Sequence, residues 1–380
     1  MLHMKISKLL VLAAIVPLFS GCANDRDHKD LVTITDMQDR VVTYNSTKTD
    51  RVICLGAGAL RYYSYIGDIQ NIVAVEEIDK QPFGVGTALR PYFHVNKDFF
   101  KDLPTCGKGG PMAQAPEYEA ILKVNPNIIV SFYDDPAVNN KLQETVGVPV
   151  IALKQGQSDI FNETTLKSLE LLGKVFSREW RYDAIKDYIE SCNTKLSSLE
   201  ETSETYYAGC IGNWGKTNLF GSFNDFPVFT HAKVKNALSP LPDLAHYRQV
   251  TIDKEKLVEL NPDKIFLDGS GVSGFIADYK QDSSVYDTLK AFENNEVYML
   301  LPFNAYYTNL EIQLMSTFYV ASIAHPTAFN NFNIETKANE IMGVFFPDAT
   351  YVSSNLYKEF LEYSTSYGGY QKVDIAELVK

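Results

Sequence analysis

The sequence predicts an α/β protein with two βα lobes, each with a parallel-sheet core, joined by one long helix and with a ligand cleft between the lobes. Three observations support this prediction. Short apolar segments alternate with helical segments, as in parallel sheets covered on both faces. Residues 163–204, in the middle of the chain, show helical rather than strand periodicity, and a motif of the first half recurs in the second.

Length and composition restrict the class of protein. The chain has 380 residues, of which 45% are hydrophobic and 12% aromatic, so most of it can form packed cores. It carries 35 Lys and Arg against 47 Asp and Glu, a formal net charge of −12. Because nucleic-acid-binding proteins present a basic surface, we expect no nucleic acid among the partners.

The N-terminus has the features of an export signal. Lys5 and Lys8 precede an apolar run, 9–19, which is too short to span a bilayer. The following Ser20-Gly21-Cys22 resembles a bacterial lipobox, which predicts a lipoprotein signal peptide at 1–21 and a lipid anchor on Cys22. An ordinary secretory signal is the alternative. Either signal places the protein in the periplasm or cell envelope, with 22–30 as a polar tether.

The N-terminal lobe is expected to cover residues 31–162. Alternating residues at 32–44 predict a hairpin with its turn at 36–39. The segments expected to form buried strands are 52–55, 71–75, 127–131 and 148–152, and those expected to form helices are 117–124 and 136–146.

Residues 163–204 are expected to form the linking helices. Gly173 and Ser177 allow a break between two helices, and the second, about 178–199, would be roughly 30 Å long at 1.5 Å per residue. Such a helix is a rigid connection rather than a flexible linker.

The C-terminal lobe is expected to cover residues 205–380. Its predicted strands are 206–211, 263–267 and 297–300, and its predicted helices are 226–238, 253–260, 308–324 and 334–344. The sequence offers no explanation for residues 346–380.

One motif occurs twice. Glu119, five intervening residues and Asn125-Pro126 correspond to Glu255, five residues and Asn261-Pro262 (255 − 119 and 262 − 126 both give 136). Each copy starts with an acid, which favours a helix N-terminus, and ends at a proline, which cannot continue a helix. We interpret the pair as equivalent units of two homologous lobes, although two ordinary helix–strand units would carry the same signals.

Together these features resemble the substrate-binding proteins of ABC importers, in the class with a single helical strut. The resemblance covers about residues 31–345. It rests on the hairpin leading into Arg51–Gly56, the repeated motif, Leu171–Lys174 and Leu301–Asn309. It implies an ABC permease and ATPase as partners, and a ferric siderophore, haem or cobalamin as ligand.

The resemblance also assigns a role to the repeated acids. In the family, an exposed acid on each lobe pairs with basic residues of the permease, and the motif places these acids at Glu119 and Glu255. Two separated charges would orient docking more than they would add affinity. Capping of the two helices by the same carboxylates is the alternative.

Ligands of two-lobed α/β proteins bind between the lobes, at loops beyond the carboxyl ends of strands. This rule selects 56–63, 81–97, 212–216 and 303–309. The candidate ligand-binding residues are Gly58, Arg61, Tyr62, Arg90, Tyr92, Trp214, Arg248, Asn304, Tyr306 and Tyr307.

Several candidates have a chemical reason and an alternative. Gly58 would let the backbone approach a ligand, and Arg61 would bind a carboxylate or phosphate, unless it is a solvent-exposed helix residue. Trp214 would stack on a flat ligand or pack between the lobes. The Asn and Tyr side chains of 303–309 would contact polar atoms, unless Thr308 or Asn309 simply caps the next helix.

Cysteines and histidines predict no metal site. The four cysteines after Cys22, which are Cys54, Cys106, Cys192 and Cys210, show no metal-ligand spacing. Export permits disulfides, but buried free thiols are the favoured interpretation. No pair among His94, His231 and His246 has ligand spacing either, so we expect the ligand to bring its own Fe or Co and the protein to hold no cofactor.

The sequence thus predicts a monomeric, lipid-anchored binding protein that captures an iron chelate of siderophore or haem type. A corrinoid-binding protein of the same class and a non-transport binding lipoprotein are the alternatives. We do not expect an enzyme. Gly56 and Gly58 with Glu76 approach a dinucleotide-binding fingerprint, but Arg61 stands where its third glycine belongs, and Gly269-Ser270-Gly271 is not a nucleophile elbow.

Overall fold

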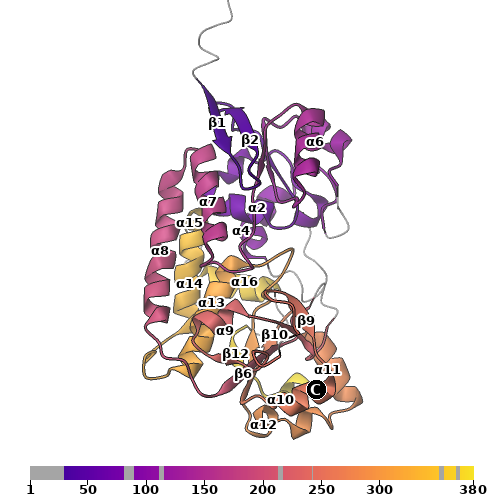
Figure 1. Cartoon of the computed structure of the whole chain (residues 1–380), viewed down its shortest axis with the longest axis vertical. Coiled ribbons are helices and arrows are strands. Elements are labelled where there is room, and N and C mark those ends of the chain that lie inside the picture. Colours follow the sequence, from indigo (N-terminus) through magenta and orange to yellow (C-terminus); the bar gives the residue numbers. More distant parts are fainter. Residues whose placement is uncertain are drawn as a thin grey trace, which may run out of the picture.

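The computed structural model describes residues 30–80, 90–110, 115–212, 217–241, 243–350, 355–364 and 369–380 (Figure 1). The predicted signal peptide, the lipid-anchor residue Cys22 and the candidate Trp214 lie outside the described residues, as does most of the tether.

The N-terminal lobe begins with an antiparallel hairpin of β1 (Leu31–Thr35) and β2 (Val41–Asn45), as predicted. A parallel sheet of order β3-β4-β5 follows, formed by β3 (Val52–Leu55), β4 (Ile128–Ser131) and β5 (Val150–Ala152). Every residue of these three strands is buried, which explains their uninterrupted apolar sequences. Helices of this lobe are α2 (Ala59–Ile66), α4 (Pro91–Phe100), α5 (Tyr118–Val124) and α6 (Pro136–Val146).

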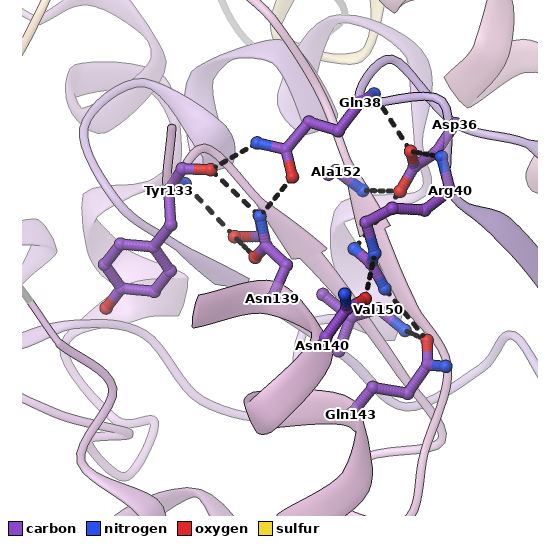
Figure 2. A network of polar contacts seen from close by, with 10 residues as sticks. Asp36, Gln38, Arg40, Tyr133, Asn139, Asn140, Gln143, Val150 and Ala152 are labelled. Atoms are coloured by element: carbon purple, nitrogen blue, oxygen red, sulfur yellow. Dashed lines mark hydrogen bonds and ion pairs between the residues drawn. The ribbon is translucent and has the colours of Figure 1, made fainter. Parts of the chain in front are cut away.

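The hairpin turn is fastened to the end of the sheet by the polar network of Figure 2. The Asp36 carboxylate accepts the backbone N–H of Ala152 at 3.1 Å. The Gln38 and Asn139 side-chain amides both donate to the carbonyl of Tyr133, at 2.7 and 2.9 Å. The network therefore fixes the segments that follow β4 and β5.

Two helices link the lobes, α7 (Glu163–Val175) and α8 (Glu179–Ser197), which confirms the predicted pair and its break. At the break, Ser177 has φ 54° and the N–H of Arg178 donates to the carbonyl of Gly173. Helix α8 runs along one side of the molecule, past both lobes (Figure 1). One continuous cluster of buried apolar side chains extends from the N-terminal lobe through these helices into the C-terminal lobe.

The C-terminal lobe has a five-stranded sheet of order β12-β11-β10-β6-β8, which is parallel except for the edge strand β12. Its strands are β6 (Thr205–Gly209), β8 (Lys235–Asn236), β10 (Lys264–Asp268), β11 (Val297–Leu300) and β12 (Gln371–Lys372). A small antiparallel pair is formed by β7 (Gly221–Phe223) and β9 (Gln249–Thr251). The helices are α9 (Pro227–His231), α10 (Lys254–Leu260), α11 (Val272–Gln281), α12 (Lys290–Glu293), α13 (Leu310–Ala324) and α14 (Ile334–Phe345).

Two predicted elements differ from the structure. The segment 71–75, predicted as a strand, makes only isolated bridges, from Ile72 to Val52 and from Val75 to Thr105. The helix predicted at 226–238 ends at His231, because Lys233 turns to φ 56° and the chain then pairs with β6 as β8.

The C-terminal segment, which the sequence left unexplained, contacts both lobes. It comprises α15 (Pro347–Thr350), α16 (Leu356–Ser364), β12 and α17 (Ile375–Leu378). Strand β12 extends the C-terminal sheet, whereas Phe360 of α16 meets the ring of His94 on α4, in the N-terminal lobe, with 5.6 Å between centroids.

Candidate functional site

The repeated motif forms the same structure in both lobes. Helices α5 and α10 each end at an asparagine in the left-handed conformation, with φ 47° at Asn125 and 36° at Asn261. A proline and a buried parallel strand follow in both copies. Glu119 and Glu255 lie in the first turns and are exposed. A carboxylate in the first turn also favours the helix N-terminus, so the docking role and the capping alternative both stay open for these acids.

An exposed apolar residue accompanies each acid. Leu122 is 49% exposed and Val258 is 41% exposed, and each lies three positions after its glutamate. Residues three apart share a helix face. Helices α5 and α10 therefore present equivalent pairs, each with one acidic and one apolar side chain.

The lobes meet at an interlobe turn, residues 302–309, which follows β11 and leads into α13. The N–H of Asn309 donates to the carbonyl of Phe303 at 2.9 Å, and that of Ala305 to the carbonyl of Tyr307 at 3.0 Å. Within the turn, Tyr306 and Tyr307 are both left-handed, with φ 51° and 74°. This is an unfavourable conformation for residues with a side chain, so contacts outside the turn must support it.

Arg61, on α2 of the N-terminal lobe, supplies such contacts. Its side chain is 0% exposed, so the solvent-exposed alternative is wrong. Its Nη2 donates to the carbonyl of Ala305 at 2.6 Å and to Asn309 Oδ1 at 2.8 Å, while Nη1 donates to the carbonyl of Tyr306 at 3.1 Å. Asn309 makes no side-chain hydrogen bond that caps α13, so the predicted capping role is wrong for this residue.

Glu76 holds the same turn from a second direction. The Tyr306 hydroxyl donates to Glu76 Oε2 at 2.7 Å, and the N–H of Gly110 donates to that hydroxyl at 3.1 Å. Burial, with a contribution from the nearby charge of Asp79, raises the pKa of Glu76 to about 8. The N–H of Gly56 donates to this carboxyl group at 3.3 Å, which links the loop after β3 to the turn.

The remaining polar candidates of the N-terminal lobe are buried too. Arg90 forms an ion pair with Asp79 at 3.1 Å, and the Tyr92 hydroxyl donates to the same carboxylate at 2.5 Å. Tyr62 packs edge-on against Phe132, with ring centroids 4.8 Å apart. In this structure Arg61, Tyr62, Arg90, Tyr92 and Tyr306 are thus engaged within the protein rather than facing solvent.

Two candidates from different lobes, the buried Gly58 and the exposed Tyr307, come together. Gly58, with φ 92°, begins α2, and a Cβ there would lie 3.6 Å from Tyr307 Cβ and 3.1 Å from Gln155 Nε2. Tyr307 is 40% exposed. The sequence nominated Gly58 and Tyr307 separately, and the fold makes them neighbours across the lobe boundary.

The two remaining described candidates are Arg248 and Asn304. Arg248 is exposed and directly precedes β9. Asn304 is half-buried, and its Oδ1 accepts a hydrogen bond from the Thr308 hydroxyl at 2.8 Å.

Gln155 and Tyr133 also lie beside these loops, although they were not predicted as site residues from the sequence. Gln155 Nε2 donates to the carbonyl of Ala57 at 2.7 Å, beside Gly58. A Cβ on Gly56 would lie 3.5 Å from the backbone nitrogen of Tyr133. Both residues follow predicted strands within three positions, so the strand-end rule, applied to β4 and β5, would have selected them.

Further polar contacts hold the lobes together beside the turn. Asp159 accepts a hydrogen bond from Gln313 Nε2 at 2.9 Å and pairs with His231 Nε2 at 2.8 Å. Tyr65 of α2 donates to the buried carboxylate of Glu311 on α13, which lies next to the turn.

The four described cysteines, Cys54, Cys106, Cys192 and Cys210, are free and buried, as favoured from the sequence. In the described ranges no cluster of three or more His, Cys, Asp or Glu side chains could hold a metal ion. Across those same ranges, no helix is both long and apolar enough to cross a membrane.

Comparison with known proteins gives the class of fold. No protein-family model matches the chain, and no curated protein matches it in sequence. Among solved structures, the molybdate periplasmic binding protein MolA of Haemophilus influenzae superposes with a TM-score of 0.63 at 16% identity, over 83% of this chain and 98% of that one.

Two further structures agree. The TroA-like periplasmic binding protein FepB of Veillonella parvula gives a TM-score of 0.60 at 19% identity, over 83% of this chain and 96% of that one. The periplasmic catecholate-siderophore binding protein VctP of Vibrio cholerae gives 0.52 at 19% identity, over 77% and 98%. The chain therefore has the two-lobed fold of the periplasmic solute-binding proteins of ABC transporters, as the sequence resemblance predicted.

Proposed function

We propose that this protein is the extracytoplasmic substrate-binding component of an ABC importer, and that it captures an iron chelate of siderophore or haem type. The observation that carries the proposal is the meeting of the exposed Tyr307 with Gly58, from strand-end loops of different lobes. Ligands of two-lobed α/β proteins bind at such positions.

The comparisons support this class of ligand. Structures with the same fold include the catecholate-siderophore binding protein, the molybdate-binding protein and a haem-binding protein, HmuT. An exposed tyrosine suits a ligand with flat aromatic or macrocyclic surfaces, because its ring can stack on them. The ligand would bring its own Fe or Co. A corrinoid has comparable flat surfaces and remains the second candidate ligand.

Docking on a permease is proposed for the matched pairs on α5 and α10. Glu119 and Glu255 would meet basic residues of the permease, and Leu122 and Val258 would add apolar contact beside each charge. Lipid on Cys22 would keep the protein at the membrane where the permease and its ATPase reside.

Thermal unfolding in the presence of single complexes tests the proposal. Ferric tris(catecholate), haemin, cyanocobalamin and molybdate are titrated separately, because a ligand that binds only the folded state raises the Tm. We expect ferric tris(catecholate) or haemin to raise it and Tyr307→Ala to abolish the rise. A rise with cyanocobalamin alone would favour the corrinoid alternative. No rise with any of the metal complexes would reject the proposal.

A further inference from the structure

The interlobe turn is part of the C-terminal lobe in sequence, but it makes contacts with both lobes. It follows β11 of the C-terminal sheet, where the N–H of Phe303 donates to buried Asp268 at 2.7 Å. Arg61 and Glu76, from the N-terminal lobe, hold its other side. The position of the turn therefore depends on both lobes.

The conformation of the turn requires this support. Tyr306 and Tyr307 are consecutive left-handed residues, and neither is a glycine. The backbone carbonyls of two successive residues, Ala305 and Tyr306, both accept hydrogen bonds from the Arg61 guanidinium. A planar group with several fixed donors is suited to two neighbouring acceptors and a third on Asn309, which a lysine ammonium could not reach in the same geometry.

Tyr306 and Tyr307 have opposite environments. Tyr306 points inward, to the Glu76 carboxyl and the N–H of Gly110. Tyr307, the next residue, is exposed beside Gly58. Anchoring the first ring thus fixes the backbone from which the second side chain projects.

We propose that Arg61 and Glu76 are positioning residues of the ligand site, which hold the interlobe turn so that Tyr307 is presented beside Gly58 before any ligand binds. The inference rests on the proposed function. It gives Arg61 a role that acts through Tyr307 and replaces the direct ligand contact expected from sequence. A site held in this way is pre-organised, so little binding energy is lost in ordering it.

The test measures, in the absence of any ligand, whether the side chain at position 307 occupies a single environment. A trifluoromethyl-phenylalanine label replaces Tyr307 in the full-length protein, and its fluorine NMR spectrum is recorded. We expect one narrow resonance. Arg61→Lys, Glu76→Met and Tyr306→Phe should each add a second resonance or broaden the first, because each removes hydrogen bonds that hold the turn.

Matched controls separate positioning from general stability. Arg181 is a buried arginine on α8 that donates to the carbonyl of Val344, away from the turn, and Tyr207 is a buried tyrosine whose hydroxyl donates to the carbonyl of Leu219 at 2.9 Å. Arg181→Lys and Tyr207→Phe should leave the label resonance unchanged. If Arg61→Lys does not fold, Glu76→Met and Tyr306→Phe decide the question.

An unchanged resonance in the folded Arg61, Glu76 and Tyr306 variants would overturn the proposal, and so would an equal change in the two controls. The proposed function is tested separately, by titrating haemin and ferric tris(catecholate) into the unlabelled protein. Failure of both complexes to bind would reject the proposed function, whereas the label reports the turn in either case.

Discussion

Helices α5 and α10 are near copies of each other, whereas the interlobe turn joins two unlike lobes through individual contacts. The copied helices keep an exposed acid and an exposed apolar residue at equivalent positions. The turn is held by Arg61, Glu76 and Asp268, each of which is buried. The comparison teaches that the proposed docking surface repeats one local unit in each lobe, whereas the proposed binding site needs residues of both lobes.

The C-terminal ends of α5 and α10 are stabilised by different contacts. Around Asn125, the Arg51 guanidinium donates to the carbonyls of Asn125 and Val124, at 2.8 and 2.7 Å. Around Asn261, the side-chain oxygen accepts the N–H of Lys290 at 3.0 Å. The same helix end is therefore stabilised by a neighbouring side chain in one lobe and by its own side chain in the other.

Charge reversal of the two acids of the repeated motif should have the largest effect, on uptake of the ligand. Glu119→Lys with Glu255→Lys is expected to abolish uptake of the ligand by cells, because both contacts with the permease become repulsive. Purified protein should keep its ligand affinity, and its free energy of unfolding should change by less than about 0.5 kcal/mol per exposed site. Loss of ligand binding in the purified double variant would refute the docking role.

Removal of the Arg61 guanidinium should destabilise the protein strongly. Arg61→Met leaves two buried acceptors and one part-buried acceptor without their donors, at about 1–3 kcal/mol for each unsatisfied buried group. We expect a loss of at least about 3 kcal/mol in urea unfolding. Arg51→Met, which removes donors near the surface of α5, should cost about 1 kcal/mol. Equal losses in the two variants would contradict the importance given to the turn.

The raised pKa of Glu76 should make the free energy of unfolding depend on pH. Its pKa is about 8 in the folded protein against an ordinary value of 4.5, so the folded state holds the proton more tightly. The contribution of Glu76 to the free energy of unfolding is therefore constant below pH 4.5, falls between about pH 4.5 and 8, and levels off above. The difference between the wild type and Glu76→Gln, measured by urea unfolding across this range, should show that fall. A flat difference would disprove it.

Glycine in place of the asparagine that ends α5 or α10 should have the smallest effect on the free energy of unfolding. Asn125→Gly relieves a left-handed residue and removes no side-chain hydrogen bond that the structure shows, so it should stay within about 0.5 kcal/mol of the wild type. Asn261→Gly removes the acceptor of the Lys290 N–H and should cost about 1 kcal/mol. Thermal unfolding measures both. The opposite ranking would show that the two helix ends are not stabilised as described.

Local signals explain what could be predicted. Helix α6 matches the predicted 136–146, because Asp135 caps it, Pro136 begins it and Gly147 ends it. The repeat predicted the paired helices and strands for the same reason. Segment 71–75 was predicted as a strand from its apolar residues, but pairing depends on distant neighbours, and only bridges form.

The interlobe contacts could not be predicted from local signals. Arg61 and its acceptor Tyr306 are 245 positions apart in the sequence, and Glu76 and the Tyr306 hydroxyl are 230 apart. Nothing near Arg61 indicates that its charge is buried against backbone carbonyls. The strand-end rule selected the two loops that meet at Gly58 and Tyr307, while the contacts of the individual side chains depend on packing between lobes.

Native mass spectrometry of the protein purified from its own host tests the central claim most directly. The account predicts that the wild type carries a small metal chelate as additional mass, and that Tyr307→Ala, prepared in parallel, loses it. Retention of the same mass in Tyr307→Ala, or a wild-type mass explained by the polypeptide and its modifications alone, would contradict capture of a ligand at the junction of the two lobes.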